Sequence, residues 1–162
     1  MTLSTYWPAI VLGLSLLAAC TNTSGREDCP MTQPVWAVHP ADPAVPGVPT
    51  HGYYYVNEDS SIWASAWWSK EDGSLFRVTE EGTKMGWFRP AGATLDITGE
   101  RLDGQSPPLR AHASCCYPTW FQTSGLYFPT GGCWEITGRA KDRSLSFVIW
   151  VEPDSQALKS NP

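Results

Sequence analysis

The strongest constraint on the fold is a strict two-residue alternation near the C-terminus. Apolar side chains occupy every second position there: Leu145, Phe147, Ile149 and Val151. Successive side chains of a β-strand point to opposite faces of the sheet, so this spacing predicts a strand with one buried face. Residues 93–98 repeat the pattern. No convincing helical period occurs after residue 20, so the sequence predicts an all-β domain.

Turn-forming residues divide the chain into short apolar runs. Asp72-Gly73 and the segments 90–92 and 129–132 are such turns, and 14 glycines and 14 prolines disfavour long helices. The predicted strands are 52–56, 62–68, 75–80, 83–89, 93–98, 121–128, 133–140 and 145–152. About eight short strands with frequent turns are typical of a β-sandwich.

The N-terminus has the features of an export signal. Residues 9–19 are apolar or small and uncharged. This run matches the roughly 7–15 residues of a signal-peptide core and is shorter than the roughly 20 that a membrane helix needs. It ends in Leu17-Ala18-Ala19-Cys20, which resembles the lipobox of bacterial lipoproteins. The resemblance implies cleavage before Cys20 and its modification by acyl chains such as palmitate, which anchor a protein stably when two or more are present. Thr21 stands where Asp would signal inner-membrane retention, so an outer-membrane location is favoured in a diderm host.

These features predict the domain organisation. Residues 1–19 form a lipoprotein signal peptide, 20–50 a lipidated cysteine and tether, 51–155 the β-sandwich domain, and 156–162 a flexible tail. The tether contains six prolines between residues 29 and 50. Because proline-rich chains favour extended geometry, we expect a semi-rigid spacer between membrane and domain.

Four cysteines remain once Cys20 is assigned to the lipid: Cys29, Cys115, Cys116 and Cys133. An exported protein meets an oxidising compartment, which favours disulfides, and four cysteines allow three pairings. A Cys115–Cys116 bond ranks last because neighbouring Cα atoms lie about 3.8 Å apart, below the usual limit of about 4.4 Å. On a strand these two side chains would point to opposite faces, so that one meets Cys133 and the other can reach Cys29.

Several segments of residues 62–151 together resemble an uncharacterised family of exported bacterial proteins. The matching stretches are WFR at 87–89, LDITGERLD at 95–103, PPL at 107–109, FQTSGL at 121–126, FPTGGCWEI at 128–136 and LSFV at 145–148. The most specific is FPTGGCWEITG, residues 128–138. The resemblance implies an immunoglobulin-like β-sandwich that ends in a hairpin, and it implies no particular activity.

A soft-metal site is the alternative use of the cysteines. His112, Cys115, Cys116 and Cys133 offer the imidazole and thiolate ligands that zinc and copper prefer, and the same residues could support thiol redox chemistry. No regular CxxC or HxH spacing is present. We therefore predict disulfides and no cofactor, with periplasmic copper, zinc or redox handling as the alternative.

Tryptophans supply the candidate binding face: Trp63, Trp67, Trp68, Trp87, Trp120 and Trp150. Aromatic rings offer large contact areas to carbohydrates or peptides, and the alternative is that they fill the core. The net charge of −5, without a basic stripe, argues against nucleic acid. No GxSxG, HExxH or P-loop spacing occurs, so we predict no enzyme. The sequence thus predicts a lipid-anchored envelope protein in contact with the membrane, with a protein or carbohydrate ligand or an accessory role.

Overall fold

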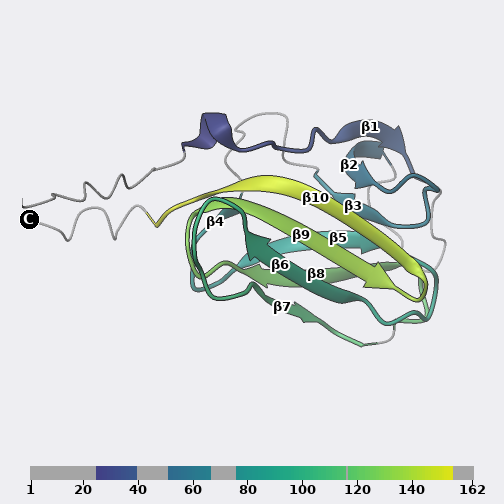
Figure 1. Ribbon diagram of the computed structural model, residues 1–162. Coiled ribbons are helices and arrows are strands. Elements are labelled where there is room, and N and C mark those ends of the chain that lie inside the picture. The colour runs from purple at the N-terminus through teal and green to yellow at the C-terminus, as the bar shows by residue number, and fades with distance from the viewer. Residues whose placement is uncertain (1–24, 40–50, 67–75, 116, 155–162) are drawn as a thin grey trace, which may run out of the picture.

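The computed structural model describes residues 25–39, 51–66, 76–115 and 117–154. Within these ranges, ten strands form two sheets packed as a sandwich (Figure 1). One sheet has six strands in the order β1-β2-β3-β5-β8-β7, and the other has four in the order β4-β10-β9-β6. The elements are η1 (Arg26–Asp28), β1 (Val35–Val38), β2 (His51–Val56), β3 (Trp63–Ser65), β4 (Phe76–Arg77), β5 (Thr83–Phe88), β6 (Asp96–Arg101), β7 (Arg110–Ala113), β8 (Phe121–Tyr127), β9 (Gly132–Ala140) and β10 (Arg143–Glu152). The predicted all-β, immunoglobulin-like sandwich is confirmed.

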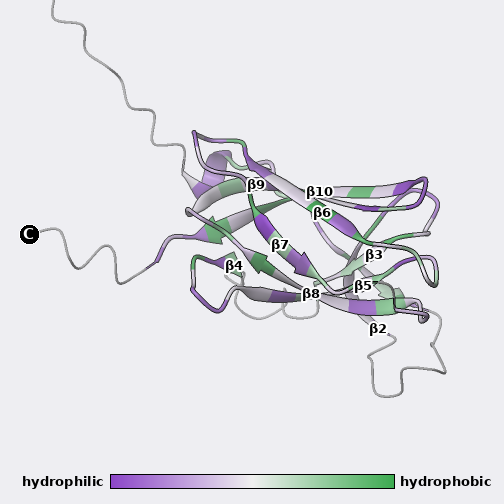
Figure 2. Ribbon diagram, turned by 90° about the horizontal axis from the view of Figure 1, so that it is seen from below, coloured by the Kyte–Doolittle hydropathy of each residue, from purple (hydrophilic) through white to green (hydrophobic). Residues whose placement is uncertain are grey.

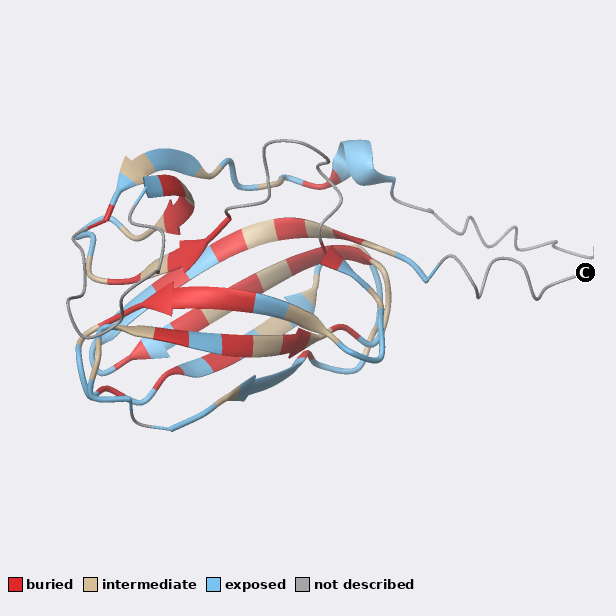
Figure 3. Cartoon of the chain, turned by 180° about the vertical axis from the view of Figure 1, so that it is seen from behind, coloured by how far each residue is buried: buried red, intermediate tan, exposed pale blue. Residues whose placement is uncertain are grey.

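The C-terminal alternation forms the hairpin of β9 and β10. The strands pair antiparallel, with Phe147 opposite Ile136 and Ile149 opposite Trp134. The four alternating apolar residues of β10 are all buried, as the red and blue segments of Figure 3 show along the strands. Figure 2 shows the corresponding alternation of hydrophobic and hydrophilic residues in the strands.

Aromatic side chains fill the space between the sheets. Trp87 of β5 and Trp134 of β9 are fully buried, and Tyr55 of β2 stacks on Phe147 with ring centroids 4.1 Å apart. Gly138 of β9 leaves room for Trp87, because a Cβ atom there would lie 2.5 Å from the indole. Closely packed rings therefore join the two sheets. In this part of the core, substitutions to smaller or to larger side chains should both lower the stability of the fold.

Two strands lie where none was predicted. β1 lies in the segment predicted to be a tether, between Pro34 and Pro40, and β7 follows the proline pair at 107–108. Both are the outermost strands of the six-stranded sheet. Of the predicted strand 62–68, β3 accounts for three residues, and Trp67 and Trp68 lie outside the described residues.

The N-terminal segment is bound to the sandwich rather than extended away from it. Cys29 forms a disulfide with Cys133, with Cα atoms 5.5 Å apart. The backbone N–H of Thr32 donates to the carbonyl oxygen of Val148 at 2.9 Å, and β1 then pairs with β2. The expectation of a spacer is therefore wrong for residues 29–38. A covalent bond and sheet pairing hold these residues despite their prolines.

The disulfide also corrects the predicted cysteine pairing. Cys133 bonds to Cys29 and not to Cys115 or Cys116. The reason is topological: β7, which precedes Cys115, pairs with β8 in the six-stranded sheet, whereas Cys133 lies in β9 of the other sheet. Cys115 is itself disulfide-bonded, and Cys116 lies outside the described residues.

A candidate ligand-binding cleft

An aromatic cleft of about 340 Å³ opens at one end of the six-stranded sheet. It is lined by His39, Ser60, Ser61, Trp63, Phe88, Arg89, Pro90 and Trp120. These residues come from the end of β1, the turn between β2 and β3, the end of β5 and the loop before β8. The volume falls at the lower end of the roughly 300–1,000 Å³ typical of small-molecule sites, so the cleft fits a single ring-sized group.

His39 forms the inner wall of the cleft. Its imidazole stacks on Phe88 with ring centroids 3.7 Å apart, and it meets Trp63 edge-on at 4.9 Å. Tyr54 of β2 packs against the same two rings at 5.4 and 5.9 Å. The β1–β2 ribbon thereby covers the outer surface of β3 and β5 and creates one side of the cleft. Edge-to-face and offset contacts of this kind are the favoured geometries of aromatic pairs.

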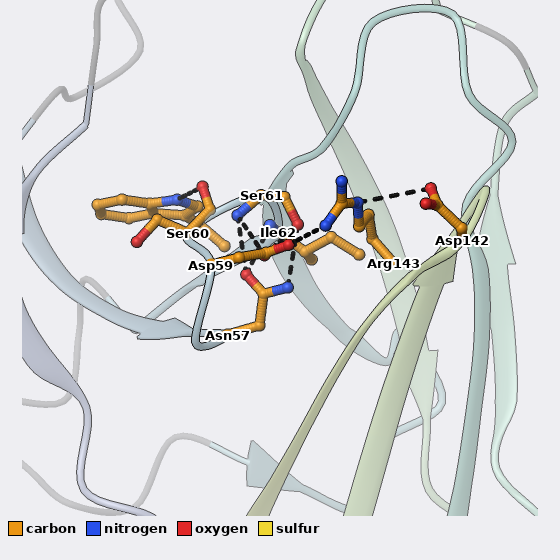
Figure 4. Close-up of polar contacts among 8 residues, drawn as sticks. Asn57, Asp59, Ser60, Ser61, Ile62, Asp142 and Arg143 are labelled. Atoms are coloured by element: carbon orange, nitrogen blue, oxygen red, sulfur yellow. Dashed lines mark hydrogen bonds and ion pairs between the residues drawn. The ribbon is translucent and has the colours of Figure 1, made fainter.

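The turn between β2 and β3 fixes the indole of Trp63 (Figure 4). Asn57 Oδ1 accepts hydrogen bonds from the backbone N–H groups of Ser61 and Ile62, both at 2.9 Å. Ser60 adopts a positive φ of 58°, and its carbonyl oxygen accepts a hydrogen bond from Trp63 Nε1 at 2.8 Å. An Asn side chain that bonds to the following backbone is a common way to close such a turn.

Asp59 ties this turn to the β9–β10 hairpin. Its carboxylate accepts a hydrogen bond from the Ser61 hydroxyl at 2.5 Å and pairs with the guanidinium of Arg143 (Figure 4). The hydrogen bond from Ser61 and the nearby charge of Arg143 hold the pKa of Asp59 below its ordinary value. Because the ionised form is the one that these contacts favour, the turn is best ordered when Asp59 is charged.

Arg89 forms the floor of the cleft and holds the loop that carries Trp120. Its Nε and Nη2 donate to Gln122 Oε1, and the remaining N–H groups donate to the carbonyl oxygens of Pro90, Tyr117 and Thr119. All five guanidinium donors therefore bond within the protein. Burial lowers the pKa of Arg89, but an arginine stays charged in a protein. The guanidinium of Arg89 holds the loop 117–120 in place through these hydrogen bonds, and none of its N–H groups remains available to an anionic ligand.

The structure brings together two of the six tryptophans predicted as a binding face. Trp63 and Trp120 line the cleft, and Trp120 is 47% exposed. Trp87 belongs to the core, and Trp150 lies half-buried on β10 in the other sheet. Trp67 and Trp68 lie outside the described residues.

Sequence reasoning missed His39, Phe88 and Arg89 as cleft residues. His39 continues the alternation of Val35 and Ala37, which could have shown that it lies on the face opposite to Trp36 and Val38. No sequence signal marks Arg89 as buried. Its position depends on carbonyl oxygens in a loop nearly thirty residues away.

The alternative metal set does not assemble around Cys133. The thiol of Cys133 is bonded to Cys29, and His112 is exposed on β7, an edge strand of the other sheet. Among the described residues, no group of three or more potential metal ligands comes together. A thiolate site with His112, Cys115, Cys116 and Cys133 is therefore contradicted by the disulfide.

No protein-family model matches this sequence, and no curated protein is similar to it at a significant level. In the part of the chain that the structure describes, no helix has the length and apolar character needed to cross a membrane.

Proposed function

We propose that this chain is an exported, lipid-anchored protein of the bacterial cell envelope that binds a neutral carbohydrate in the aromatic cleft without catalysing a reaction. The single observation that carries the binding role is the indole of Trp120, which stands 47% exposed at the mouth of a formed cavity. Anchoring is supported by the sequence Leu17-Ala18-Ala19-Cys20 after an apolar run.

The chemistry of the lining supports a neutral ligand. Arg89 uses its five donors inside the protein, and the carboxylate of Asp59 is paired with Arg143. Four aromatic rings and Ser60 are among the residues that line the cleft. His39 and Phe88 are buried in its wall, so the rings accessible to a ligand are those of Trp63 and Trp120. A sugar ring has an apolar C–H face that packs on aromatic rings, and hydroxyl groups that bond to a polar rim.

The location of the cleft supports access from outside. Arg143, which pairs with Asp59, lies in the hairpin at the far end of β9 from Cys133. β9 has nine residues, which at about 3.4 Å per residue separates the cleft from the Cys29–Cys133 disulfide by most of the length of the domain. A ligand in the cleft therefore does not compete with the anchored end for space.

The test is a titration of the purified mature protein with neutral oligosaccharides of hexoses and N-acetylhexosamines, followed by tryptophan fluorescence and calorimetry. We expect saturable binding that Trp120→Ala weakens at least about tenfold. Trp36→Ala is the matched control, because Trp36 is also exposed but lies outside the cleft. Equal binding by the Trp120→Ala variant, or no saturable binding to any neutral sugar, would contradict the proposal. Binding of a proline-rich or aromatic peptide that depends on Trp120 would reassign the ligand to the peptides.

A further inference from the structure

We infer that an apolar face of the β1–β2 ribbon lies against the lipid bilayer that holds Cys20. This face, which we call the overhang, consists of Trp36, Val38 and Tyr53. The inference rests on the anchoring part of the proposed function, and it adds an orientation: one side of the sandwich rests on lipid and the cleft points away from it.

The overhang is a continuation of the core surface beyond the edge of the smaller sheet. Tyr55 of β2 stacks on Phe147 of the four-stranded sheet, and Tyr53, two residues earlier, lies on the same face of β2. Trp36 is the strand partner of Tyr53, with rings 5.1 Å apart, and Val38 is the next residue of β1 on that face. The larger sheet has six strands and the smaller sheet has four. The apolar inner face of the larger sheet therefore extends beyond the edge of the smaller sheet, which leaves the overhang uncovered.

Its exposure is unusual for such side chains. Trp36 is 57% and Val38 is 71% exposed, and Val35 at the start of the same strand is also exposed. The strand Val-Trp-Ala-Val carries no charge. An apolar surface of this kind marks a contact site, and an indole is favoured at the boundary between lipid and water.

The short link between Cys20 and the domain supports the lipid bilayer as the partner of the overhang. Cys20 is separated from Gly25, the first described residue, by five peptide links, which reach roughly 17 Å when fully extended. From there η1 and the segment up to β1 run along one side of the sandwich (Figure 1), and the Cys29–Cys133 disulfide and the hydrogen bond from Thr32 to Val148 hold them there. The link to the anchor therefore leaves the domain on the same side as the overhang (Figure 1), which places this side within reach of the bilayer.

Because the protein carries a net negative charge, we expect its contact with lipid to be apolar rather than electrostatic. The net charge of −5 opposes attraction to anionic lipids. The residues that pair with β1 are Tyr54, Tyr53, Gly52 and His51, and none of them is a lysine, an arginine or a carboxylate. We therefore expect the contact to form on zwitterionic lipid and to resist salt, in contrast to a basic surface.

The cleft lies on the opposite face of the same ribbon. Val38 and His39 are consecutive residues, and Val38 is 71% exposed on the overhang whereas His39 is 6% exposed in the wall of the cleft. These opposite exposures place the two side chains on opposite sides of the ribbon, so lipid under the overhang leaves the cleft open to the aqueous side.

The experiment reconstitutes the acylated mature protein in phosphatidylcholine vesicles that contain dibromo-phosphatidylcholine, which quenches nearby indoles. Trp36→Phe keeps an apolar ring and removes the indole, and Trp120→Phe is the matched control at the other tryptophan that is exposed among the described residues. We expect quenching of the unaltered protein, loss of most of this quenching in Trp36→Phe, and no loss in Trp120→Phe. The pattern should persist in high salt.

Two other results would overturn the inference. Quenching that is the same with and without Trp36, or that is lost in Trp120→Phe, places another side of the domain on the lipid. Flotation of the vesicles and the mass of the N-terminal peptide report the anchor independently. A protein that floats and carries acyl chains while Trp36 is not quenched refutes the orientation alone, whereas a protein without acyl chains refutes the anchor and the orientation together.

Discussion

Arg89 and Gln122 are joined by a buried hydrogen bond, in which Arg89 Nε donates to Gln122 Oε1 at 2.8 Å. Each of the two residues is only 2% exposed. A buried charge usually requires an opposite charge or complete hydrogen bonding. Here the guanidinium is stabilised by hydrogen bonds to neutral oxygens, three of which are backbone carbonyls. The pair therefore couples the stability of the domain to the position of the Trp120 loop.

Replacing Arg89 by Met should destabilise the protein by about 3 kcal/mol, because it leaves the buried side-chain oxygen of Gln122 and three part-buried backbone carbonyl oxygens without this donor. Denaturant unfolding measures the loss. Arg110→Met is the control: Arg110 is exposed on β7, and its guanidinium lies over the ring of Tyr127 at 5.2 Å, so its replacement should change stability by less than about 1 kcal/mol. Similar effects of the two variants would show that the buried hydrogen bonds of Arg89 contribute little.

Replacing Cys29 and Cys133 together by Ala should lower the free energy of unfolding by about 2–5 kcal/mol, because the bond closes a loop of about 100 residues in the unfolded chain. The sequence separation is 104 residues. The midpoint of urea unfolding under oxidising conditions measures the effect. Adding a reductant to the double variant then reports the separate contribution of the disulfide at Cys115. An unchanged midpoint in the double variant would mean that residues 25–38 are held by sheet pairing alone.

The contacts of Asp59 should make the β2–β3 turn sensitive to acid. The pKa of Asp59 is lowered from 3.8 in the folded protein, first by the hydrogen bond from the Ser61 side chain. A carboxyl group with a lowered folded pKa stabilises the fold above its unfolded pKa, and this contribution is lost as the pH falls through the folded value. The stability difference between the native protein and Asp59→Asn should therefore be present at pH 6, begin to shrink as the pH falls below about 3.8, and disappear below the still lower pKa of the folded protein. A difference independent of pH would exclude this linkage.

Gly138→Ala should destabilise the core by about 1–3 kcal/mol through overpacking. The new Cβ atom would lie 2.5 Å from Cζ3 of Trp87, a residue that is fully buried. Thermal unfolding and the near-ultraviolet circular dichroism of the indole both report the change. Gly25→Ala is the matched control, because a Cβ atom at Gly25 meets nothing within 4 Å. A stable Gly138→Ala variant would show that the core around Trp87 can rearrange.

Cys20→Ser should release the protein from the membrane fraction, because a serine cannot carry the thioether-linked lipid of the proposed anchor. Fractionation in high salt separates lipid anchoring from ionic adsorption. The cleft should keep the proposed affinity for sugars in this variant, since the disulfide and the sheets remain. Retention of Cys20→Ser in the membrane fraction would rule out the lipid anchor.

The alternation of apolar residues was sufficient to predict the all-β sandwich and most of its strands. β9 and β10 were the clearest, because each presents one face to the core along its whole length. β1 was missed because the flanking prolines suggested a spacer, although an edge strand tolerates proline beside it. β7 was missed because its residues, Arg-Ala-His-Ala, are mostly exposed and show no apolar alternation.

The sequence was sufficient to predict that tryptophans line the site, but not which tryptophans do so. Trp63 and Trp120 belonged to the predicted set, yet Trp87 has the same chemistry and lies in the core. Which tryptophan lines a cavity depends on the turn at Asn57 and on the loop held by Arg89, and these contacts join segments distant in sequence. The disulfide partner of Cys133 likewise depends on which strands form each sheet. Local sequence patterns do not show how strands are distributed between two sheets.

The Cys29–Cys133 bond has a mechanical consequence for a chain that is pulled from its N-terminus. Tension applied before Cys29 passes through the covalent bond into β9, a central strand held on both sides by β6 and β10. The β1–β2 pairing therefore bears none of the load, although β1 is the first strand in the part of the chain that the structure describes. The wall of the cleft, which begins at His39, is thereby shielded from forces that act on the N-terminus.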